Sequence, residues 1–158
     1  MYDLAVPPVL QALGQGQRLL AMATPEMLQA RLAPGMFDCA AQFAVLASFG
    51  IRATFPMTTL AAPTLSDDPA EALATAIAAV AALSPADFTG SEARIITHRA
   101  GFADLTQPAP DYLQRFALPN LWFHLAMAFA ILRQEGLQIG KADFDGLHAY
   151  PQDFTFDD

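Results

Sequence analysis

The sequence predicts an all-α fold, a four-helix bundle with a short extra helix and a small β-hairpin before the last long helix. Apolar residues recur at three- and four-residue spacing in four long segments, which is typical of helices with a buried face. One long segment and the short helix each begin at a capping residue followed by proline, at Asp68-Pro69 and Thr24-Pro25. The 158 residues show no internal repeat and no linker, so residues 1–158 are expected to form a single domain, with an irregular tail over about 145–158.

The first long helix is expected from about Pro7 to Met22, because proline is tolerated in a first turn, where its missing N–H has no helical partner. A short helix should follow. Thr24 supplies a cap before Pro25, and the segment should stop near Pro34.

The second long helix is expected from about Met36 to Arg52 and is apolar nearly all round. One stripe consists of Phe37, Ala41, Ala44, Val45 and Ser48, and other faces carry Phe43, Leu46 and Phe49. A helix of this kind lies centrally in a bundle or at a contact between subunits.

The third helix has a clear start, in which Asp68 caps the chain before Pro69 and Glu71 stands at the third helical position. This spacing allows a capping box, in which both side chains satisfy free backbone amides. The helix should end before Ser84-Pro85, because a residue before proline avoids the helical region.

Residues 87–110 lose the helical period, and apolar residues flank Arg99-Ala100-Gly101, which favours a hairpin. The fourth helix is expected to begin near Pro110 and to end at Gly136, with a bend or restart at Pro119. One face of this helix carries Leu121, His124, Leu125, Ala128 and Ile131.

The composition limits the partners of the protein. Apolar residues make up 54% and charged residues 15%, against about 25% charged in an average domain. We therefore expect exposed alanine together with a face that is buried in a homodimer. The net charge is −8 and the eight basic residues are scattered, so neither nucleic acid nor an anionic membrane surface is an expected partner.

A cytoplasmic location is expected, since the single cysteine excludes an internal disulfide and the N-terminus lacks the pattern of a signal peptide. The most apolar stretch, Phe116–Leu132, is short for a membrane span and contains three polar or helix-breaking residues. It is better interpreted as a buried helix.

The segment YLQRFALPNLWFHLAMAFAILRQEG, followed by IGKADF, resembles an uncharacterised bacterial family, domain of unknown function nineteen ninety-three. The opening YDLAVP, the segment ARLAPGMF and the pattern LPN-aromatic-x-x-H resemble the same family in matching order, so the likeness spans nearly the whole chain.

That family is similar to the DinB and YfiT group of four-helix bundles, many of which are dimers that hold a divalent metal through three histidines. The resemblance implies one ligand from the second helix and two from a later helix, four residues apart. His124 matches one late position, but Asn120 and Ala128 stand four residues before and after it, and the second helix has no histidine. We therefore expect no complete metal site and no cofactor.

His124 has two further interpretations. It is a histidine at the edge of the core, bonded to a carbonyl, to Asn120 or to water. Alternatively, His124, Asn120 and Tyr112 line a small-ligand pocket between helices, because Asn120 and His124 are one helical turn apart. Trp122 points away from them and is expected to serve packing.

Cys39 is the remaining candidate ligand-binding residue. It lies in the first turns of its helix, which favours a thiolate slightly, whereas the neighbouring Asp38 disfavours one. An inert, half-buried thiol is the simpler interpretation. A metal site formed by His124, Cys39 and either Asp38 or Gln42 is conceivable if the second and fourth helices face each other.

Two function hypotheses follow. The first is a dimeric small-ligand-binding or scaffold protein that has the bundle without the full three-histidine site. The second is a metal- or thiol-dependent transferase or hydrolase that uses His124, with help from Asn120, Cys39 or Tyr112.

Overall fold

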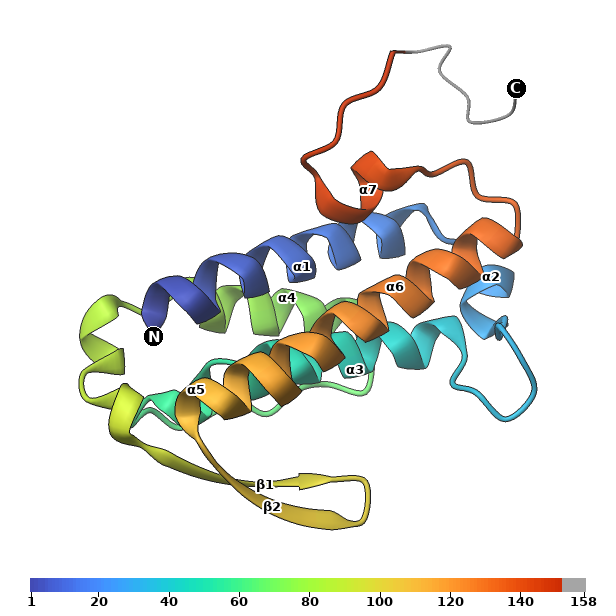
Figure 1. Cartoon of the computed structure of the whole chain (residues 1–158). Helices are drawn as coiled ribbons and strands as arrows, with labels where there is room; N and C mark the ends of the chain where they lie inside the picture. The colour runs from blue at the N-terminus through green and yellow to red at the C-terminus, as the bar shows by residue number, and fades with distance from the viewer. Residues whose placement is uncertain (152–158) are drawn as a thin grey trace.

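The computed structural model describes residues 1–151 and shows a bundle of four long helices (Figure 1). These are α1 (Tyr2–Met22), α3 (Cys39–Arg52), α4 (Pro69–Ala81) and α6 (Leu118–Gln134). The shorter elements are α2 (Pro25–Gln29), η1 (Phe55–Met57), η2 (Pro85–Phe88), η3 (Ser91–Ala93), β1 (Ile95–Ala100), β2 (Ala103–Pro108), α5 (Ala109–Tyr112), η4 (Leu113–Ala117) and α7 (Lys141–Asp145). The predicted four-helix bundle with a short extra helix and a hairpin is confirmed.

The four long helices form a square in which α1 and α3 each pack against both α4 and α6. Helices α1 and α6 run in one direction and α3 and α4 in the other (Figure 1). The connection between α3 and α4 therefore runs back along part of the bundle before α4 begins (Figure 1). This arrangement sets α3 antiparallel to α6, and the seam between these two helices contains the candidate site.

Two helix starts differ from the prediction. Helix α1 begins at Tyr2 and includes Pro7 and Pro8, whose missing N–H groups weaken its second turn. Complete burial of Ala5 and Val9 and the edge-to-face contact of Tyr2 with Phe88 offset that loss.

Helix α3 begins at Cys39 instead of Met36, because Asp38 is its cap and accepts the N–H of Ala41 at 2.9 Å. The predicted cap of α4 is also present, since Asp68 accepts the N–H groups of Ala70 and Glu71. The reciprocal half of the expected capping box is absent, because the Glu71 carboxylate accepts the Ser66 hydroxyl instead.

Two glycines allow α1 and α3 to approach closely. A Cβ atom on Gly16 would lie 2.4 Å from Cδ2 of Leu46, and one on Gly50 would lie 2.8 Å from Cδ1 of Leu13. No larger residue fits at either position without displacing a buried leucine side chain. These glycines therefore serve packing, although they lower intrinsic helix stability.

The hairpin occupies the predicted place. Strands β1 and β2 pair antiparallel, with His98 opposite Leu105, and Gly101 adopts a positive φ of 59° in the turn. The hairpin extends from the bundle beside α5 (Figure 1), and Phe102 at its tip is 98% exposed.

A π-helical turn, η4, separates α5 from α6 and accounts for the interruption expected at Pro119. The N–H of Leu118 donates to the carbonyl of Leu113, five residues back instead of four. Pro119 directly follows this wide turn as the second residue of α6, so the interruption at the proline takes the form of a π-helical turn and not of a helix end.

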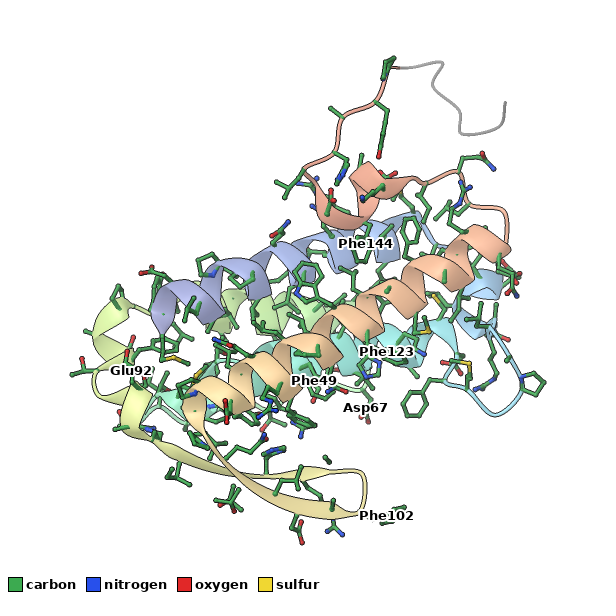
Figure 2. The ribbon with its side chains drawn as sticks, in the orientation of Figure 1. Phe49, Asp67, Glu92, Phe102, Phe123 and Phe144 are labelled. Atoms are coloured by element: carbon green, nitrogen blue, oxygen red, sulfur yellow. The ribbon has the colours of Figure 1, made fainter. Side chains whose placement is uncertain are left out.

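Residues 141–145 form the helix α7, which was not predicted and ends where the tail expected over about 145–158 begins. Phe144 of this helix points toward the bundle (Figure 2). Its ring contacts those of Trp122 and Phe129. Asp143 accepts the N–H of Gly140 at 2.7 Å and so caps the helix. This cap was missed because the segment mixes aromatic and acidic residues without a helical period. The rest of the predicted tail, residues 152–158, lies outside the described residues.

Within residues 1–151, the helical stretch Ala109–Gln134 is long and apolar enough to cross a membrane by composition, and Pro69–Ala81 with Pro85–Ala93 qualifies as a pair bent by 86°. Helix α6 packs against α1 and α3, and its buried positions include Leu121, Leu125 and Ile131.

Candidate functional site

The site centres on a hydrogen bond between His124 of α6 and Gln42 of α3. Nδ1 of His124 lies 2.8 Å from Oε1 of Gln42, and both side chains are buried. An amide oxygen only accepts, so Nδ1 is the protonated nitrogen of the imidazole in this arrangement. The other ring nitrogen, Nε2, keeps its lone pair and has no hydrogen-bond partner within residues 1–151.

Aromatic rings surround the imidazole. Phe49 of α3 stacks on it at 5.5 Å, and Phe123 of α6 meets it edge-on at 5.2 Å. Figure 2 shows these two phenylalanines at the seam between α3 and α6. Burial lowers the pKa of His124 below its usual value, since a charged imidazole would lose its hydration there. The ring is therefore neutral at physiological pH.

Asn120 and Tyr112 both direct a polar group to backbone carbonyls. The Asn120 amide donates to the carbonyl of Phe116 at 2.7 Å, and the Tyr112 hydroxyl donates to the carbonyl of Arg52 at 2.8 Å. Burial raises the pKa of Tyr112, with Arg52 opposing the shift, so the phenol stays protonated. The partner of His124 is Gln42 and not Asn120.

A second group of residues adjoins the site and was not among the sequence candidates. Arg52 lies over the rings of Phe49 and Phe116, 4.6 Å and 5.0 Å from their centroids, and its guanidinium donates to the carbonyl of Arg99 in the hairpin. His98 packs at 4.2 Å on Phe116. The hairpin is thus joined to the His124 site through Phe116, a contact that helical periodicity does not reveal.

Cys39 lies one turn before Gln42 on α3 and is completely buried. Its sulfur faces the carbonyl of Ala128 at 4.0 Å, on the same seam as His124. Burial, reinforced by the charge of Asp38, raises the pKa of the thiol to about 12. Cys39 is accordingly a protonated core residue in this structure.

The residues present do not fit a three-histidine metal site. Beside His124 stand the Gln42 amide, the methyl group of Ala128 and the protonated thiol of Cys39, and a neutral amide is a poor substitute for imidazole. Within residues 1–151, no three His, Cys, Asp or Glu side chains converge in a way that suits a metal ion.

Gln42 was expected only as one alternative ligand of a metal site with His124 and Cys39, and its hydrogen bond with His124 was not predicted, although its polar position was an available signal. It is the one amide side chain in the otherwise apolar run of α3, and Phe49 follows seven residues later on the same face. Phe116 and Arg52 carried no such signal, because their contact depends on the π-helical turn and on the antiparallel packing of α3 and α6.

Comparison with known proteins agrees with this architecture. The family model described as Domain of unknown function (DUF1993) matches residues 1–145. Among solved structures, the chain is similar to a DinB family member protein from Shewanella denitrificans, with a TM-score of 0.81 and 24% identity over 95% of this chain and 94% of that one. No curated protein matches the chain in sequence. The structural likeness establishes the DinB-like fold, and the family match shows that the chain belongs to DUF1993.

Proposed function

We propose that this protein is a non-catalytic, dimeric small-ligand-binding protein with a DinB-like bundle and an incomplete metal site. The observation that carries the proposal is the hydrogen bond between His124 and Gln42. This bond engages Nδ1 of His124, the histidine that matches a metal-ligand position of the fold family. It leaves Nε2 as a neutral hydrogen-bond acceptor. That acceptor suits an organic hydrogen-bond donor.

The ligand expected at this site donates hydrogen bonds and carries an apolar or aromatic part. Nε2 of His124 is available as a hydrogen-bond acceptor. The side-chain oxygen of Asn120, one turn away on α6, is a second acceptor, because the side-chain nitrogen of Asn120 already donates to the carbonyl of Phe116. Phe49 and Phe123 supply ring surface on either side of the imidazole. A small aromatic amine or alcohol matches this combination.

The proposal is tested by nuclear magnetic resonance with 4-hydroxybenzylamine as the probe. Saturable shifts of amides around His124 are expected in the wild-type protein and in His148→Gln, which changes an exposed histidine elsewhere. The variant His124→Gln should lose them. Shifts that persist in His124→Gln, or that map to another surface, contradict the proposed site.

The alternative is a metal- or thiol-dependent transferase or hydrolase that uses His124. The protonated Cys39 thiol argues against the thiol branch. The metal branch is tested by calorimetric titration of untagged protein with Zn²⁺, for which no stoichiometric binding is expected. The double variant Gln42→His and Asn120→His serves as a positive control, since it would place three imidazoles around the seam. Stoichiometric Zn²⁺ on the wild-type protein would favour the enzyme.

The dimer is supported by aromatic side chains that the single chain leaves in solvent. Phe102, Phe37 and Phe123 are 98%, 55% and 49% exposed. Sedimentation at micromolar concentration should give twice the mass of one chain, and a monomer would contradict this part of the proposal. We place the protein in the cytoplasm, in keeping with its one cysteine.

A further inference from the structure

A cavity of about 360 Å³ lies between the C-terminal half of α1 and the helix α7, away from the His124 seam. Helix α7 crosses α1 there (Figure 1). The lining residues are Gln15, Arg18, Ala21, Met22, Ala142 and Asp143. The volume is within the range of small-molecule sites, and most of the lining surface is apolar.

Two opposite charges line this cavity without pairing. Arg18 of α1 has no ion pair within residues 1–151, and neither does Asp143 of α7. One carboxylate oxygen of Asp143 accepts the N–H of Gly140, which orients the group and leaves its second oxygen available. A cation and an anion that share one cavity but do not touch favour a ligand that carries both charges.

A buried amide provides a second, independent indication of a ligand. Gln15 is 7% exposed, and its Oε1 has no hydrogen-bond partner within residues 1–151. Its Nε2 lies against Gly146, where a Cβ atom would be only 2.2 Å away. A buried amide oxygen without a partner is destabilising, so evolution usually removes it unless a bound group or a small movement of the covering segment completes it.

We propose that the cavity between α1 and α7 binds a free α-amino acid with an apolar side chain. Arg18 pairs with its carboxylate, Asp143 with its ammonium group, and Ala21, Met22 and Ala142 contact its side chain. A modest shift of α7 brings the Gln15 amide into reach of the polar end. Helix α7 has only five residues and is held by the ring contacts of Phe144 and by the Gln11 amide, which donates to the carbonyl of Asp145 at 2.7 Å, so a modest shift rearranges few contacts.

The test is a titration of the full-length protein, followed by nuclear magnetic resonance, with three probes. L-leucine carries both charges, N-acetyl-L-leucine lacks the ammonium group, and L-leucinamide lacks the carboxylate. L-leucine should shift amides of α1 and α7 saturably, with each of the other probes bound about fivefold more weakly, as expected for loss of one solvent-exposed ion pair. Equal binding of the three probes, shifts elsewhere, or no saturable shift at millimolar concentrations would overturn the proposal.

Matched variants locate the two charges. Arg18→Gln should weaken L-leucine and N-acetyl-L-leucine but not L-leucinamide, and Asp143→Asn should weaken L-leucine and L-leucinamide but not N-acetyl-L-leucine. Arg115→Gln and Asp104→Asn, both exposed and distant from the cavity, should leave all three unchanged. An unchanged affinity in Arg18→Gln and Asp143→Asn would refute the site. His124→Gln should not alter L-leucine binding, so this test is independent of the function proposed above.

Discussion

Nδ1 of His124 and Oε1 of Gln42 are 2.8 Å apart and join α6 to α3 across the buried seam of the bundle. In a metal-binding relative of this fold, the resemblance implies, an ion would link the same two helices. Here a neutral hydrogen bond makes that link. The bond fixes the imidazole tautomer and satisfies two buried polar groups at once, so its removal has consequences for stability and for the site.

Gln42→Leu should lower the free energy of unfolding by about 1–3 kcal/mol, because the buried Nδ1–H of His124 loses the Gln42 oxygen that accepts it. Urea unfolding followed by circular dichroism measures the change. Gln17→Leu, on the exposed face of α1, is the matched control and should shift the midpoint little. An equally stable Gln42→Leu variant would mean that the seam accommodates an unpaired imidazole.

The stability should depend on the protonation of His124. Burial lowers its folded-state pKa below the ordinary 6.5, so the unfolded chain binds the proton more readily than the folded one. As the pH falls below about 6.5, the wild-type protein should therefore lose unfolding free energy relative to His124→Gln. Urea titrations of both proteins between about pH 8 and 5 measure the difference. If the wild-type protein instead gained unfolding free energy relative to His124→Gln at acid pH, the pKa of His124 would be raised by folding and not lowered.

Two glycines of α1 should respond in opposite ways to alanine. Gly14 has open space around the position of a Cβ atom, so Gly14→Ala should stabilise the protein by about 0.5–1 kcal/mol through helix propensity. Gly16→Ala places its methyl group 2.4 Å from the fully buried Leu46. The cost of overpacking, about 1–3 kcal/mol, should exceed the gain in helix propensity, so this variant should be less stable. Thermal unfolding of the pair gives the comparison, and similar midpoints would indicate that Leu46 moves freely.

Cys39 should be nearly inert in the folded protein. With a pKa of about 12, roughly one thiol in ten thousand is ionised near pH 8, and the sulfur is also out of solvent. A disulfide reagent such as dithionitrobenzoate should react slowly with native protein and rapidly in guanidinium chloride. Rapid labelling of the native protein would show that the α3 N-terminus opens readily.

The helices were predictable where local chemistry decides them. The cap at Asp68 and the turn at Gly101 are short-range features, and both occur where the sequence indicates them. The start of α1 was wrong because burial of Ala5 and Val9 overrides the preference of Pro7 for a first turn. Tertiary packing, which a single sequence does not display, made that decision.

The candidate site shows the same division. The buried position of His124 on α6 followed from periodicity, whereas its pairing with Gln42 required the relative placement of α3 and α6. His98 was assigned correctly to the hairpin, but its contact with Phe116 depends on how the hairpin folds back on the bundle. Contacts between distant segments are set by topology, and no spacing rule within one helix encodes them.

The widened turn before α6 sets the direction in which its first residues face. One additional residue in a helical turn rotates everything upstream by about 100° relative to an uninterrupted α-helix. That rotation is what aims the phenol of Tyr112 at the end of α3, where it reaches the carbonyl of Arg52. An insertion or deletion between residues 113 and 117 would therefore rotate Tyr112 and the hairpin about the helix axis relative to His124. It would do so even if every other side chain were unchanged.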